Sequence, residues 1–244
     1  MSDDDRPTGL MRSRREVLAL LGATAAAALA GYSNAQSGSG RPTVGPACIL
    51  TPEQTEGPYF VDERLNRSDI RVDPSDGSVK AGLPLTLRLR IVSIGNAGCV
   101  PLPGAVVDIW HCDAQGIYSD ATDPGFNTQG KKFLRGYQVT DESGGVLFTT
   151  IYPGWYPGRA VHIHFKVRAK AGSGRGQEFT SQLYFDDSIT DRVHARKPYA
   201  GDARRRLKND GDGLFRDGGR RLMLSLAEGA QGYAGSFDVG LRMA

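Results

Sequence analysis

The stretch that decides the fold reads Tyr152-Pro-Gly-Trp-Tyr-Pro-Gly-Arg-Ala-Val-His-Ile-His-Phe-Lys-Val167. Its tail, from Ala160 to Arg168, alternates apolar residues and histidines with other types, which predicts a β-strand. Successive strand side chains point to opposite faces, so His162 and His164 share one face, roughly 7 Å apart at Cα. Two imidazoles at this spacing can converge on one metal ion. The alternative is a pair of half-buried, hydrogen-bonded histidines.

Two residues upstream of the pair add to the metal hypothesis. Tyr156 lies in a Pro-Gly-rich turn, from which its phenol can reach the same point. Arg159 lies three residues before His162 and places a cation beside the candidate site.

The rest of the chain predicts an all-β fold. Segment 83–94 alternates cleanly, with Thr86, Arg88 and Arg90 opposite an apolar face, as in a half-buried antiparallel strand. Further strands are expected at Ala105–Cys112, Leu134–Thr140, Val146–Ile151, Ser181–Phe185 and Ser236–Met243. The polar segment Ile189–Leu207 is expected to be mostly loop or short helix. Short strands at regular spacing predict an antiparallel β-sandwich with long active-site loops.

Length and charge limit the functional classes. The chain of 244 residues suits one sizeable domain with a full core. A formal net charge of +3 is too small to indicate binding to nucleic acid or to an anionic membrane.

Residues 1–35 are predicted to be a cleavable leader. Ser13-Arg-Arg-Glu-Val-Leu18 resembles the twin-arginine export signal, and the apolar run after it is shorter than the roughly 20 residues of a membrane span. Ser33-Asn-Ala35 then offers a cleavage site of small residues. We therefore expect export by the twin-arginine machinery to the periplasm or the medium, without a stable membrane anchor. A membrane anchor and a core helix are the alternatives.

The start of the leader has two candidates. Asp3, Asp4 and Asp5 are unusual in a region that is normally positive, so both Met1 and Met11 stay open as the start residue.

The mature chain is expected to consist of a flexible linker, 36–47, and one β-sandwich domain, 48–244. It contains three cysteines, Cys48, Cys99 and Cys112. Export permits a disulfide, and an odd count leaves one thiol over, so we expect one disulfide with its pairing open.

Several separated motifs resemble those of intradiol ring-cleavage dioxygenases, in the same order. They are Thr55-Glu-Gly-Pro-Tyr59, Trp110-His-x-x-x-x-Gly-x-Tyr-Ser119, Pro153-Gly-x-Tyr-Pro157, Arg159-x-x-His-x-His-Phe165 and Ser181-Gln-Leu-Tyr-Phe185. The resemblance covers about Cys48 to Phe215 and includes Tyr118, which its loop alone would not single out.

The resemblance implies that Tyr118, Tyr156, His162 and His164 bind one non-haem Fe(III). Phenolate oxygens suit this hard cation, and a bound cation deprotonates a phenol whose free pKa is about 10. A zinc site more often combines histidine with cysteine or carboxylate ligands. A ferrous oxygenase site needs a carboxylate beside the two histidines, and the sequence places none there.

The resemblance also implies the reaction. A catechol-type diol displaces Tyr156, which accepts a proton, and O2 cleaves the bond between the two hydroxyl-bearing carbons to give a cis,cis-muconate-type diacid. Arg159 would stabilise developing charge, and Gln182 would orient the intermediate. Pro58 and Tyr59 would form walls of the substrate pocket.

The chain departs from the family pattern in the short spacer between Tyr156 and Arg159 and in lacking the long N-terminal helical region of catechol 1,2-dioxygenases. His111 and His194 match no ligand position and are interpreted as structural. Two other functions stay open. A β-sandwich binding module would have no reason to pair both tyrosines with the histidines, and a zinc hydrolase would need a carboxylate ligand.

Overall fold

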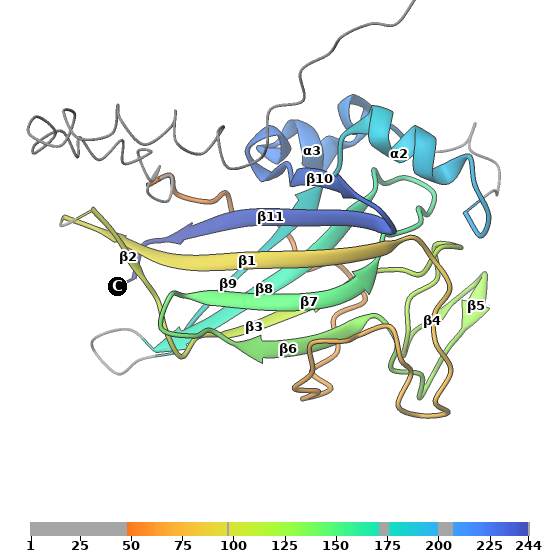
Figure 1. The fold of residues 1–244 in the computed structure, drawn as a ribbon, viewed down its shortest axis with the longest axis horizontal. Coiled ribbons are helices and arrows are strands. Elements are labelled where there is room, and N and C mark those ends of the chain that lie inside the picture. The colour runs from red at the N-terminus through yellow and green to blue at the C-terminus, as the bar shows by residue number, and fades with distance from the viewer. Residues whose placement is uncertain (1–47, 97, 171–175, 200–206, 244) are drawn as a thin grey trace, which may run out of the picture. The chain divides into compact units, whose positions relative to one another are not determined.

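The computed structural model describes residues 48–96, 98–170, 176–199 and 207–243 (Figure 1). The predicted leader, linker and export signal lie outside these residues. The described chain is mostly β, as the sequence predicts. None of its helices is both long and apolar enough to cross a membrane.

The first sheet has five strands in the order β10-β11-β1-β2, with β7 also paired to β1. Its strands are β1 (Pro84–Gly95), β2 (Gly98–Pro101), β7 (Gly145–Ile151), β10 (Ser225–Gly229) and β11 (Gly232–Leu241). Strand β1 shows the predicted alternation: Leu85, Leu87 and Leu89 are fully buried, whereas Thr86 and Arg88 are exposed.

The second sheet has four antiparallel strands in the order β6-β3-β8-β9. Its strands are β3 (Val106–Trp110), β6 (Arg135–Val139), β8 (His162–Lys170) and β9 (Gly176–Tyr184). A short hairpin of β4 (Thr122–Asp123) and β5 (Phe126–Asn127) follows β3. Figure 1 shows β11, β1 and β7 in front of β8, β9 and β3.

The main core lies between these two sheets. Leu87 and Leu89 of β1 belong to the same buried cluster as Ile163, Phe165 and Val167 of β8. Apolar positions two residues apart face this core from both sheets, which confirms the predicted sandwich of two layers.

The prediction of an antiparallel sandwich is wrong at one strand pair. Strands β1 and β11 pair in parallel, with Leu89 opposite Phe237. A parallel pair needs a long connection, and here most of the chain lies between the two strands. The alternation within each strand reports which face is buried, but it does not report the direction of the neighbouring strand.

Short helices connect β9 to β10. They are α2 (Asp187–His194), η2 (Asn209–Gly211), α3 (Gly213–Arg216) and η3 (Gly219–Leu222). Asp186 caps α2 and Asp212 caps α3, each by accepting hydrogen bonds from backbone N–H groups of the first turn. The cap of α3 matters for the site below, because the same carboxylate also binds an arginine.

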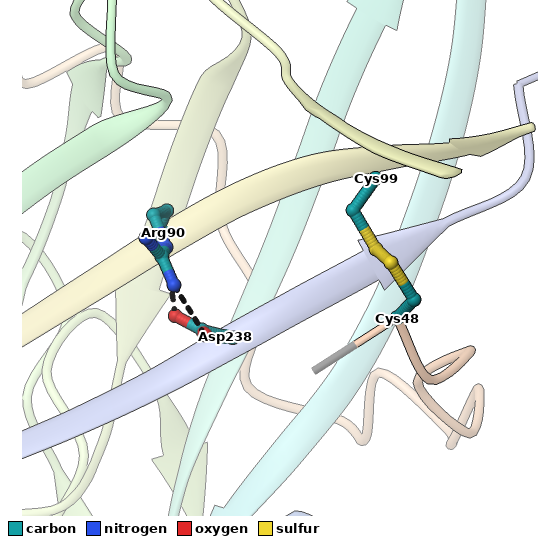
Figure 2. Close-up of a disulfide and its surroundings, with 4 residues drawn as sticks. All are labelled: Cys48, Arg90, Cys99 and Asp238. Carbon is teal, nitrogen blue, oxygen red and sulfur yellow. Dashed lines mark hydrogen bonds and ion pairs between the residues drawn. A yellow bond between two sulfur atoms is a disulfide. The ribbon is translucent and has the colours of Figure 1, made fainter. Parts of the chain in front are cut away.

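One disulfide joins Cys48 to Cys99, which settles the pairing that the sequence left open (Figure 2). Cys112 is a buried free thiol. The disulfide ties the start of the described chain to β2. Next to it, Leu50 bridges to Gly240 of β11, and the Thr51 N–H donates to the Gly240 carbonyl. The segment that follows is thereby led from the first sheet toward the outer face of the second.

Candidate functional site

Strand β8 places its two histidines side by side on the face directed away from the main core. The strand pairs with β3 and β9, with His164 between Trp110 and Gln182. His162 and His164 are both buried, and their Nε2 atoms lie 3.0 Å apart. The predicted shared face is confirmed.

The tautomer of His162 follows from its contacts. Its Nδ1 lies 2.6 Å from the Ala160 carbonyl oxygen, which can only accept a hydrogen bond. Nδ1 therefore carries the proton, and Nε2 presents a lone pair toward His164. A metal-binding histidine commonly has this arrangement, with one ring nitrogen anchored to a carbonyl and the other free to bind.

Two loops bring tyrosines to the same place. The Oη of Tyr156 lies 3.3 Å from Nε2 of His162, and the ring centroids of Tyr156 and Tyr118 are 5.6 Å apart. The Tyr118 ring is 6.3 Å from the ring of His164. The structure thus brings together all four residues that the sequence singled out as ligands.

The local sequence explains how the two tyrosine loops meet. Asp113 accepts hydrogen bonds from the N–H groups of Gln115 and Ile117, which shapes the turn before Tyr118. Gly116 has a φ of 83°, and a Cβ there would come within 2.1 Å of the Trp155 carbonyl oxygen. Only glycine lets this turn pack directly against the loop that carries Tyr156.

Burial sets the protonation of the four side chains. It lowers the pKa of His162 to about 3, with the charge of Arg159 adding to the effect, and lowers that of His164 well below the usual value. Burial also raises the pKa of Tyr118 well above the usual value and raises that of Tyr156. Without a cation, the site therefore holds neutral imidazoles and protonated phenols.

The residues present fit a metal ion. Within the described part of the chain, neither Oη of Tyr118 nor Nδ1 of His164 has a hydrogen-bond partner, although both are buried. An unpaired buried polar group is costly, and a cation would relieve the cost at the phenol oxygen. In the described residues no group of three or more His, Cys, Asp and Glu side chains gathers to hold a metal ion.

A polar network holds Arg159 beside the histidines. Its Nε donates to Oδ2 of Asp212 at 2.9 Å, and its Nη2 donates to Oε1 of Gln182 at 2.5 Å. Asp212 also accepts the Ala160 N–H, and its pKa is lowered because these hydrogen bonds and the charge of Arg159 outweigh burial, which alone would raise it. Tyr184 lies next to the guanidinium, with its Oη 3.3 Å from Nη2.

The segment that starts at the disulfide covers the site. Gln54 donates to the carbonyls of Leu214 and Asp217 and accepts from Tyr184 Oη. Three residues on, Gly57 lies against His164, since a Cβ at Gly57 would be 3.2 Å from its Cε1.

The two predicted pocket residues differ in position. Tyr59 stacks on Tyr118, with ring centroids 4.4 Å apart, and lines a cavity of about 710 Å³ that also borders Tyr156. Pro58 is exposed and is not among the described residues that line this cavity.

His111 and His194 are bonded within the protein, as the structural interpretation expects. His111 lies between the Cys112 carbonyl and the Thr150 hydroxyl, and His194 contacts the Pro153 carbonyl.

The sequence does not show which residues support Arg159. Asp212, Gln54 and Tyr184 lie far from it in the sequence and are joined to it only by the fold. Two local signals were present: Tyr184 lies in the Ser181–Phe185 motif, and Asp212 stands directly before a short helix, as capping residues do.

The known proteins that are similar to this chain are dioxygenases. A family model described as “Dioxygenase” matches residues 55–212. Among solved structures, an intradiol ring-cleavage dioxygenase from Tetranychus urticae is 34% identical, with a TM-score of 0.70 over 80% of this chain and 95% of that chain. The dioxygenase domain of a fusion protein from Streptomyces sp. SirexAA-E is 30% identical, with a TM-score of 0.58 over 80% of this chain and 100% of that chain.

Curated relatives match over a shorter region. A protocatechuate 3,4-dioxygenase beta chain from Burkholderia cepacia is 31% identical over 46% of this chain and 51% of its own length. A catechol 1,2-dioxygenase from Acinetobacter baylyi is 37% identical over 49% of this chain and 42% of its own length. The chain therefore spans about half the length of the curated relatives it matches.

Proposed function

Since the chain belongs to the intradiol ring-cleavage dioxygenase family, we propose that it cleaves catechol-type aromatic diols with O2 between their two hydroxyl-bearing carbons, giving cis,cis-muconate-type diacids. The observation that carries this proposal is the convergence of two buried histidines and two tyrosines at one point, with the Tyr118 Oη left without a partner in the described residues.

The proposed cofactor is one Fe(III), held by Tyr118, Tyr156, His162 and His164. The donor set supports ferric iron, because phenolate oxygen suits a hard cation and the neutral imidazoles are ready to bind. When bound, the ion supplies Lewis acidity that draws electron density from a catecholate and makes its ring reactive toward O2.

The two tyrosines have different environments, which suits different roles. Tyr118 is fully buried and packed under Tyr59, so it is proposed to stay in place. Tyr156 borders the cavity, and its Oη is proposed to accept one of the two catechol protons as the diol enters. The nearby charge of Arg159 favours the ionised phenol, whereas burial, the larger effect, raises the pKa of Tyr156 and so favours its protonation.

Arg159 and Gln182 are proposed to act on the substrate as a unit. The hydrogen bond between them and the pairing of Arg159 with Asp212 fix the direction of the guanidinium before substrate arrives. A charge held in place in advance stabilises developing negative charge without reorganisation.

The test is incubation of the iron-loaded protein with catechol under 18O2, followed by mass analysis. We expect a diacid that carries both oxygen atoms and a red-brown protein colour from tyrosinate-to-ferric charge transfer. A yellow semialdehyde, or a diacid without label, would contradict the proposal. A coloured ferric protein that turns over no catechol would favour the binding-module alternative.

We also propose that the protein is exported in folded form and loses its leader near Ala35. The support is the twin-arginine pattern at Arg14 and Arg15 together with the Cys48–Cys99 disulfide, since disulfides persist in oxidising compartments. Changing both arginines to lysine should keep the precursor inside the cell, as seen by fractionation. Normal secretion of that variant would contradict the twin-arginine route.

A further inference from the structure

The cavity beside Tyr156 is larger than a single aromatic ring requires. Its volume of about 710 Å³ lies in the range of pockets that bury drug-sized ligands, roughly 300–1,000 Å³. Its walls come from the turn before Tyr118, the β4–β5 hairpin, the Tyr156 loop and the residues Pro198 and Tyr199. A diol seated at Tyr156 therefore has room for an extended substituent.

The walls of this cavity are mainly aromatic and apolar. Trp155, Phe126 and Ile117 line it together with Tyr59. Such walls suit the carbon frame of a substituent but do not discriminate by charge.

The described lining residues bring one carboxylate to the cavity. Among the described lining residues, Asp123 is the one acidic side chain, and none is Lys, Arg or His. Arg159, the cation beside the ligands, is not among them and is engaged by Asp212 and Gln182. A substituent in the cavity therefore meets a negative charge and no described positive one.

The Asp123 carboxylate is held in place by hydrogen bonds but can accept more of them. Its Oδ2 accepts from Tyr59 Oη at 2.9 Å, and its Oδ1 accepts from the Gly125 N–H at 3.2 Å. The Tyr59 hydroxyl is the donor in this contact, because an ionised carboxylate can only accept a hydrogen bond. A carboxylate offers about four lone-pair sites, which leaves room for a donor on the substrate.

We propose that this cavity selects catechols with an extended substituent and ranks them cationic, then neutral, then anionic, with Asp123 as the specificity-determining residue. The inference rests on the proposed function, because it assumes that the diol binds at Tyr156. It excludes carboxylated catechols as preferred substrates.

The test compares three catechols that differ mainly in the charge of a side chain at ring carbon 4. The side chains are aminoethyl, propyl and carboxyethyl. We expect kcat/KM of the iron-loaded protein to fall in that order. In Asp123→Asn the ratio of kcat/KM for the cationic compound to kcat/KM for the neutral one should fall about fivefold, which is the scale of a partly exposed ion pair.

Asp120→Asn is the matched control. Asp120 lies in the loop just before β4 and outside the described cavity lining; it accepts the Gly130 N–H, and its φ of 47° suits asparagine. This variant should keep the wild-type ranking. Equal values for the three compounds, a preference for the anionic one, or no change in Asp123→Asn would overturn the inference.

Dissociation constants measured by calorimetry without O2 separate the two proposals. If catechol itself is not cleaved, the proposed function fails, while the charge order of the three constants still supports or overturns the selection. If catechol is cleaved and neither kcat/KM nor binding follows charge, only the selection fails.

Discussion

Strands β1 and β8 both alternate core-facing apolar residues with polar ones, but the face directed away from the core is exposed in β1 and covered in β8. In β1 the residues opposite the core include Thr86 and Arg88, which are exposed. In β8 the residues opposite the core include His162, His164 and Lys166, and these three are buried.

The difference comes from the segment that follows the disulfide. Gly57 lies against His164, Phe60 packs on Trp110, and the Lys166 ammonium lies over the Phe60 ring and pairs with Glu56. Covering polar side chains costs free energy unless they gain partners. A polar strand face that is nevertheless covered indicates a site, whereas an exposed polar face indicates only solvent.

The largest expected effect separates these two polar faces. His164→Ala should lose iron and colour, and activity should fall by more than about 100-fold, the upper range for losing even an outer partner of a metal ligand. Arg88→Ala, at the corresponding kind of position on β1, should change stability by less than about 0.5 kcal/mol. Metal analysis, visible spectra and rates on both variants decide it. Full iron in His164→Ala would remove the distinction between the faces.

A second prediction concerns the arginine that the covered face holds in place. Arg159→Ala should keep iron and colour and still bind catechol with a spectral shift, but turn over about 100- to 1000-fold more slowly, as for the loss of one aimed donor. Steady-state rates and anaerobic titration measure the two parts separately. Arg90→Ala on β1 is the control, and equal rates in both variants would refute the role of Arg159.

Much of this site could be predicted because it is local. The two histidines are two residues apart on a strand, so the period of the strand alone places them on one face. Tyr156 was indicated by its Pro-Gly-rich turn close to the histidines, whereas Tyr118 followed only from motif order.

The rest could not be predicted because it depends on contacts between distant segments. Asp212 meets Arg159 across 53 residues, and Tyr59 meets Asp123 across 64. The parallel pairing of β1 with β11 is of the same kind, since neither strand's pattern specifies its neighbour. Partner choice is a property of the assembled sheets.

A third prediction compares the inner faces, which should behave alike in stability. Leu87 of β1 and Ile163 of β8 are both fully buried, so Leu87→Ala and Ile163→Ala should each cost about 2–5 kcal/mol. Only Ile163→Ala should also shift the visible spectrum, because it lies between the two predicted ligands. Urea unfolding and spectroscopy test this. A spectral shift in Leu87→Ala would contradict it.

A fourth prediction uses a carboxylate on the covered face. Burial raises the pKa of Asp108 on β3 to about 6, despite the opposing charge of Arg168. The folded state therefore keeps the proton to a higher pH than the unfolded state. As the pH rises from about 4 to 6, the free energy of unfolding should fall by on the order of 2 kcal/mol.

Asp108→Asn should lose this part of the pH dependence. Unfolding of both proteins across that range isolates the contribution of Asp108. A wild-type curve that rises relative to the variant between pH 4 and 6 would mean that Asp108 ionises readily and that its surroundings are not low in polarity.

The smallest expected effect lies on the exposed face of β1. Arg90 and Asp238 face each other across β1 and β11 and form two hydrogen bonds, at 3.0 and 2.7 Å (Figure 2). Their side chains are 37% and 33% exposed, whereas those of the Arg159–Asp212 pair are 16% and 2% exposed.

Water and salt screen the Arg90–Asp238 pair, so Asp238→Asn should cost no more than about 1 kcal/mol and less still at high salt. Asp212→Asn should cost about 3–5 kcal/mol, because it leaves a buried guanidinium uncompensated. Urea unfolding at low and high salt measures both. Equal losses in the two variants would show that burial, in which the two pairs differ, does not set what each pair contributes to stability.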